Sequence, residues 1–273
     1  MQKPKFIIYA GTLLLAATVT FFAACRKNDN KDTTTTKEDT GYASDQAMSE
    51  KIFDDVQTLA DKGNTTTGSG AFKTSSCGTV THTSGAFTID FGTTNCLCAD
   101  GRNRRGKVIV TYSGAYRDSA ATHTITFDNY YQNDNKVEGT KTVTNMGTNS
   151  AGQQYFNISV NGTITKPDGT VISVSYNRVR TWIAGSSTLL NWTDDVYEIT
   201  GGGTITRPSG VIDVNISSPL VVALNCRHIE AGTIVYTLPS GLTRSLNYGN
   251  TAICDDEAIL TLPSGATYTI TLP

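Results

Sequence analysis

Apolar and polar side chains alternate one by one from about Phe72 to the end of the chain, and this period of two constrains the fold most. Successive side chains of a β-strand point to opposite faces, so such segments predict antiparallel strands with one buried and one wet face. In the stretches YFNISVNGTI, VISVSYN, VIDVNIS and TYTITL, the apolar positions are Phe156, Ile158, Val160 and Ile164, then Ile172, Val174 and Tyr176, then Ile212, Val214 and Ile216, and last Tyr268, Ile270 and Leu272.

Four turns of one type separate these strands. They are KPDG, RPSG, LPSG and LPSG, at Pro167, Pro208, Pro239 and Pro263. Proline presets the first turn position and glycine takes the positive φ, so each turn predicts a hairpin. About fourteen strands are possible, and open twisted sheets seldom exceed about ten without curling or splitting. We therefore expect residues 70–273 to form an all-β domain, a large antiparallel meander of hairpins curled into a half-barrel or sandwich.

One segment ahead of the strands has a helical period instead. In residues 44–63 the apolar side chains fall near one face at spacings of three and four: Ala47, Ile52, Val56, Leu59 and Ala60. Ser44 is a suitable N-cap, and Gly63 is a suitable stop. The sequence predicts one short amphipathic helix here, packed on the sheet through its apolar stripe.

The N-terminus has the parts of an export signal. Lys3 and Lys5 precede an apolar run over residues 6–22, and two alanines follow it. This run also suits an ordinary secretory signal or an uncleaved membrane anchor. The segment FAAC, ending at Cys25, resembles a bacterial lipobox, although Phe22 stands where leucine is commoner. We expect a signal peptide over residues 1–24, acylation of Cys25 that attaches the chain to the membrane, and a disordered tether over residues 25–43.

The charge and the remaining cysteines limit the chemistry. The whole chain has a net charge of −2, so no basic field exists and we expect no nucleic-acid partner. Export favours disulfides, and five cysteines after Cys25 allow fifteen arrangements of two bridges. Clustering favours Cys77 with Cys96 or Cys98, and Cys226 with Cys254. A zinc site from Cys77, His82, Cys96 and Cys98 has poor spacing, so we expect no metal and no cofactor.

The strand VISVSYNRVRTW raises a conflict that indicates a candidate ligand site. Strict alternation aims Arg178, Arg180 and Trp182 at the same face as the apolar residues before them. Buried arginines are costly unless they are paired. Two hypotheses follow: a β-bulge turns these side chains to solvent, or the strand end opens into a pocket where they meet a carboxylate such as Glu198. In the pocket, Trp182 together with Trp192 would suit a sugar or an anionic group.

Catalytic motifs are scarce. The sequence has three histidines and contains neither a G-x-S-x-G nor an H-E-x-x-H motif. Paired carboxylates of the kind used by glycosidases are conceivable among six acidic residues, although their segments read first as polar turns. These residues are Asp194, Asp195, Glu198, Asp255, Asp256 and Glu257.

Several segments together resemble a family of Bacteroidota outer-membrane lipoproteins with an all-β fold and no assigned activity. They are AMSEKIFDDVQTLAD, FTIDFGTTNCLCADGRNRRGKVIVTYSGAY, ITFDNYYQNDNKVEGTKTV, VYEITGGGTIT and LNYGNTAICDDEAILTLPSG. The resemblance implies an envelope lipoprotein of the outer membrane and transfers no catalytic residue. We therefore expect a lipid-anchored, noncatalytic binding or structural module with a glycan or envelope-protein partner. The alternative is a secreted glycan-active hydrolase with paired carboxylates.

Overall fold

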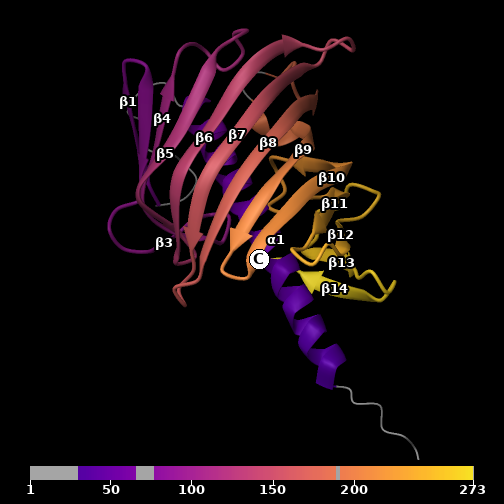
Figure 1. The fold of residues 1–273 in the computed structure, drawn as a ribbon. Helices are drawn as coiled ribbons and strands as arrows, with labels where there is room; N and C mark the ends of the chain where they lie inside the picture. The colour runs from indigo at the N-terminus through magenta and orange to yellow at the C-terminus, as the bar shows by residue number, and fades with distance from the viewer. Residues whose placement is uncertain (1–29, 66–76, 189–190, 273) are drawn as a thin grey trace, which may run out of the picture.

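The computed structural model describes residues 30–65, 77–188 and 191–272, so the expected signal peptide and Cys25 lie outside the described residues. Within these ranges the chain forms one α-helix, α1 (Asn30–Thr65), and a 14-stranded antiparallel sheet (Figure 1). The strands are β1 (Thr79–Thr83), β2 (Ala86–Asp90), β3 (Cys96–Leu97), β4 (Asn103–Tyr112), β5 (Thr122–Gln132), β6 (Asn135–Thr148), β7 (Gln154–Thr165), β8 (Val171–Ala184), β9 (Val196–Arg207), β10 (Gly210–Ala223), β11 (Ala231–Thr237), β12 (Thr243–Asn247), β13 (Glu257–Thr261) and β14 (Thr267–Thr271).

The sheet is a meander. Each strand from β4 to β14 pairs with the next strand along the chain, while β2 pairs with β4 and the short β3 also pairs with β4. The four proline turns lie between β7 and β8, β9 and β10, β11 and β12, and β13 and β14. In the first of them Gly169 has φ +83° and donates its N–H to Lys166 O at 2.9 Å. The predicted hairpins are therefore confirmed.

The sheet curls around α1 and is not closed into a barrel. The hydrogen-bonded path runs from β1 at one edge to β14 at the other, yet both β2 and β14 contact α1. In Figure 1 the helix crosses behind the central strands, and its N-terminal end extends beyond the sheet. The all-β fold with a curled antiparallel sheet is as predicted.

The core lies between α1 and the inner face of the sheet. The predicted apolar faces of β7, β8 and β10 are buried, as are Ala47, Ile52, Val56, Leu59 and Ala60 of the helix. The helix also buries polar side chains on its other sides, which a single apolar stripe does not predict. They are Asp45, Gln46, Ser49, Lys51, Asp55 and Gln57. The curled sheet covers more than one side of the helix, and this explains their burial.

The helix is longer than its apolar pattern indicates. It begins at Asn30, so residues 30–43 are helical where a disordered tether was predicted, and Ser44 and Gly63 lie inside it as neither cap nor stop. A docked helix extends at little cost, because each added residue gains one backbone hydrogen bond. Gly63 serves close packing instead, since a Cβ there would lie 2.5 Å from Cε2 of Phe87. Within the described residues, no helix has the length and apolar character needed to cross a membrane.

Two disulfides join segments of the sheet. One links Cys77 to Cys96 and the other links Cys226 to Cys254, so the prediction for the second pair is confirmed. Of the two partners considered for Cys77, the structure selects Cys96. Cys98 is a buried free thiol.

Candidate functional site

The arginines and the tryptophan at the end of β8 are buried on the inner face of the sheet. Arg178, Arg180 and Trp182 are only 5%, 3% and 5% exposed, and they alternate with outward-facing neighbours without interruption. The hypothesis that a bulge turns them to solvent is therefore wrong. The register shift against β9 comes later, between Trp182 and Ala184.

The partners of the two arginines come from the helix. Arg178 forms an ion pair with Glu50, and Arg180 Nη2 donates to Asp61 Oδ2 at 2.9 Å. Glu198, the suggested partner, pairs across the sheet with Thr181. Cross-strand neighbours share a face, so Glu198 lies on the face opposite that of the arginines. The prediction of Glu198 is wrong for this reason.

Arg180 is held on several sides within the core. Its Nη1 donates to the hydroxyl of Tyr116 at 2.8 Å, and its guanidinium lies 3.4 Å from the ring centroid of Tyr197. Burial raises the pKa of Tyr116 and of Tyr197, so both phenols stay protonated. Arg178 and Arg180 thus fasten α1 to the sheet, while Trp182 lines a cavity beside them.

This cavity, which we call the aromatic cavity, has a volume of about 250 Å³. It is formed by the end of α1, the turn after β4 and the segment between β8 and β9. The side chains that define it are Asp61, Tyr116, Arg117, Trp182, Trp192, Asp195 and Tyr197. Two of the four predicted site residues, Trp182 and Trp192, therefore meet in one cavity.

Two residues that line the aromatic cavity carry a buried donor and a buried acceptor without a hydrogen-bond partner. Asp195 is 7% exposed, and neither its Oδ1 nor Nε1 of Trp182 has a hydrogen-bond partner. Burial, and then the charges of Asp61 and Asp194, raise the pKa of Asp195 to about 6. The nearby indole of Trp182, which interacts with this carboxyl group, opposes the rise. An orphaned buried polar group is costly, and a ligand or water that bonds to it removes the cost.

The ring of Trp182 is packed on two other groups that line this cavity. The guanidinium of Arg117 lies 4.3 Å from its ring centroid, and the ring of Tyr197 packs at 5.3 Å. Trp192 is half-buried and belongs to the short 3₁₀ helix η1 (Trp192–Asp194), which Asn191 caps through Oδ1. Lys62 Nζ lies 4.0 Å from the Trp192 centroid, and Trp192 also lines a second cavity of about 460 Å³.

No protein-family model, curated protein or solved structure matches this chain. The side chains of the site must therefore support any functional conclusion by themselves. Sequence reasoning missed Asp61, Tyr116 and Tyr197, which come from three separate elements. The sequence held one partial signal for Asp61. This residue is charged and lies in the last turns of a helix that was expected to pack on the sheet.

The carboxylates considered for catalysis are not gathered in one place. Asp255, Asp256 and Glu257 are exposed at the start of β13. Of the six predicted acidic residues, only Asp195 lines the aromatic cavity, where its companion is Asp61.

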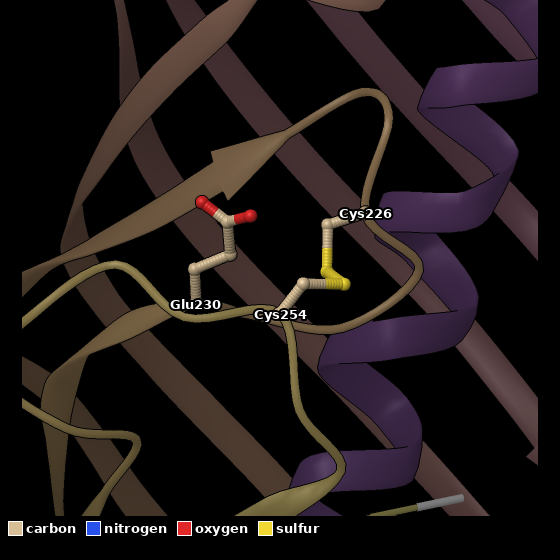
Figure 2. Close-up of side chains that lie close together, drawn as sticks. All are labelled: Cys226, Glu230 and Cys254. Carbon is tan, nitrogen blue, oxygen red and sulfur yellow. A yellow bond between two sulfur atoms is a disulfide. The ribbon is translucent and has the colours of Figure 1, made fainter.

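Two groups of potential metal ligands are consumed by disulfides. Figure 2 shows Glu230 beside the sulfur atoms of Cys226 and Cys254, which are bonded to each other. Zinc binds cysteine as the thiolate, so these sulfurs are not ligands while the bridge persists. The same holds for Cys77 and Cys96 of the zinc alternative.

Proposed function

We propose that this protein is a lipid-anchored binding module of the bacterial outer membrane that takes a saccharide in the aromatic cavity. The observation that carries the proposal is the orphaned pair of Asp195 Oδ1 and Trp182 Nε1 in an aromatic-walled cavity. The resemblance to envelope lipoproteins supports the location.

A sugar hydroxyl suits this pair because it both donates and accepts. One hydroxyl placed between the two groups would accept from the indole N–H and donate to the carboxylate. Burial of both groups in the protein makes each such bond worth more than it would be in water. The half-buried ring of Trp192 adds a flat apolar surface for the C–H face of a sugar.

Anchoring through Cys25 accounts for the sequence that precedes the helix. Several acyl chains at about 0.8 kcal/mol per buried CH₂ hold a protein on a bilayer far more firmly than one chain does. Cys25→Ala is expected to move the protein from the membrane fraction to the soluble fraction on ultracentrifugation. Retention in the membrane after this change would show that the anchor is an uncleaved apolar segment.

Saccharide binding is tested on a glycan array and then by calorimetry with the full-length protein in detergent. Trp192→Ala is expected to weaken binding by more than tenfold, while Trp192→Phe retains most of it because the flat ring remains. Tyr131→Ala, which removes an aromatic side chain outside the cavity, serves as the control. Equal affinities for the parent protein and Trp192→Ala would refute the site.

A glycan hydrolase is the second candidate, and one observation favours it. Asp195, with its raised pKa, shares the aromatic cavity with Asp61, and glycosidases use a protonated acid beside a second carboxylate. In that case Asp195 would protonate the leaving oxygen. Release of reducing ends from a bound glycan, lost in Asp195→Asn while binding persists, would establish hydrolysis. Glycan binding without release of reducing ends would reject the hydrolase and favour the binding module.

A further inference from the structure

The larger cavity, which we call the cationic cavity, lies beside the C-terminal half of α1. Its volume is about 460 Å³, and its wall includes the loop from Cys98 to Arg102 and the segment from Leu224 to Arg227. Seven charged side chains line it. They are Lys51, Asp55, Lys62, Asp100, Arg102, Arg104 and Arg227.

Asp55 on α1 fixes one part of this charged wall. Its Oδ1 lies 2.8 Å from Lys51 Nζ, and its Oδ2 lies 2.7 Å from Arg102 Nε. Gln132 Nε2 also donates to Oδ2 at 2.7 Å. The carboxylate of Asp55 is therefore fully occupied and holds two of the cations in place.

Asp100 fixes the other part. Arg104 donates to both of its oxygens, at 2.8 and 2.6 Å, and Arg102 Nη1 lies 3.3 Å from it. Burial opposes ionisation of Asp100, but Arg104 and Arg102 outweigh it and hold its pKa at about 2. Arg104 also donates from Nε to Tyr130 at 3.2 Å. The guanidinium groups are thus positioned before any ligand arrives.

The cationic cavity has more positive charge than its own acids neutralise. Five cationic side chains against two carboxylates give a formal charge of +3, in a chain whose net charge is −2. Burial lowers the pKa of Lys62, and the charge of Arg104 adds to this effect, while the carboxylates of Asp100, Asp55 and Asp61 oppose it. An anion within this wall would balance the excess positive charge of the lining.

We propose that the cationic cavity binds a small molecule through a compact oxyanion, either a phosphate or a carboxylate. Guanidinium groups recognise such oxyanions with short, directional hydrogen bonds, and Arg227 is the arginine placed to do so. Arg102 and Arg104 contribute charge, because each of their guanidinium nitrogens already donates to a protein acceptor. Arg227, an exposed side chain that lines the cavity, supplies charge beyond the two carboxylate-centred clusters. The two cavities share Trp192, but none of the seven charged side chains of this site lines the aromatic cavity, so each proposal stands if the other fails.

Calorimetry with the full-length protein tests the proposal at low and at physiological salt. The probes are glucose 6-phosphate, glucuronate, inorganic phosphate and neutral glucose. Binding of either charged sugar in preference to glucose, weakened by salt, is the expected result. Inorganic phosphate and glucuronate separate the two oxyanion sources. Failure of every anion to bind, or equal binding of glucose in a manner insensitive to Arg227 substitution, would overturn the proposal.

Arg227→Gln places the interaction in this cavity. It is expected to weaken anion binding by about tenfold, equivalent to the loss of one charged hydrogen bond. Lys107→Gln makes the same charge change on a half-exposed side chain outside the cavity and is expected to leave affinity unchanged. Arg227 is exposed, so the variant is expected to keep its melting temperature, which calorimetry checks. Equal losses in the two variants would show a nonspecific charge effect and reject the site. Loss of binding to both charged sugars in Arg117→Gln, which changes a side chain of the aromatic cavity alone, with binding intact in Arg227→Gln, would place them in the aromatic cavity and also reject the site.

Discussion

Arg180 on β8 donates to Asp61 on α1 at 2.9 Å, across 119 positions of sequence, with side chains that are 3% and 11% exposed. This ion pair joins the two layers of the molecule beside the aromatic cavity. Arg178 and Glu50 make a second junction of the same kind. Such pairs stabilise a fold little in comparison with apolar packing, but breaking one partner leaves a buried charge.

Removal of Asp61 should therefore be severe, and removal of both partners should be milder. Asp61→Ala is expected to lower the free energy of unfolding by about 3–5 kcal/mol, because Arg180 stays buried without its counter-charge. Adding Arg180→Met is expected to recover much of this loss. Urea unfolding measures both, and Lys136→Ala, which breaks a largely exposed pair with Glu138, should leave the free energy of unfolding almost unchanged. A double variant less stable than Asp61→Ala would contradict this account.

The cysteine pairing of the structure and the stability that the Cys226–Cys254 bridge contributes can both be tested. Replacing Cys226 and Cys254 by alanine is expected to lower the free energy of unfolding by about 3.5 kcal/mol, from loop-closure entropy over the 28-residue separation. Denaturant unfolding with and without a reductant measures this loss. Non-reducing peptide mapping should find these two bridged, Cys77 bridged to Cys96, and Cys98 free. A Cys77–Cys98 peptide would show that the first bridge is wrongly placed.

Asp195 should make stability depend on pH. Its folded-state pKa of about 6 lies above the unfolded value of about 3.9, so the folded chain keeps a proton that the unfolded chain has lost. Stability from this group is therefore complete below pH ~4 and is lost as pH rises through ~6. Asp195→Asn is expected to melt above the parent protein at pH ~7.5, by a margin that shrinks towards pH ~4. Scanning calorimetry across this pH range measures the difference in melting temperature. A difference that does not depend on pH would be evidence against the raised pKa of Asp195.

At Gly162 a side chain of the helix packs directly against the backbone of the sheet. A Cβ at this position would lie 2.4 Å from Phe53 Cζ and 3.0 Å from Glu138 O. Gly162→Ala is expected to cost about 1–3 kcal/mol of stability through overpacking. Adding Phe53→Leu should make the combined cost less than the sum of the two single costs. Gly41→Ala on the helix meets no atom within 4 Å and should be neutral or slightly stabilising. Additive effects of the Gly162 and Phe53 changes would disprove the contact.

The sequence predicts the strands well because their signals are local. Alternation over Phe156–Ile164 and a proline-glycine turn at Pro167 depend on neighbours only, and the structure confirms both. It predicts the site less well because the partners are distant. The predicted burial of Arg178 and Arg180 is visible within one strand. Which carboxylates pair with them depends on how α1 docks on the sheet. The polar residues of the helix read as a solvated face until the curl of the sheet is known.

Because the sheet is a meander, the contacts of this protein fall into two classes, between strands adjacent in sequence and between the helix and strands distant in sequence. Each hairpin joins strands adjacent in sequence, so the sheet can grow strand by strand from contacts that close short loops. The helix comes first in the chain, yet Glu50 and Asp61 meet arginines 128 and 119 positions later. Non-local contacts form slowly, because the chain entropy is lost before the contact is gained. We therefore expect α1 to dock as a late, rate-limiting step, and a newly synthesised chain to expose the inner face of its sheet until the helix covers it.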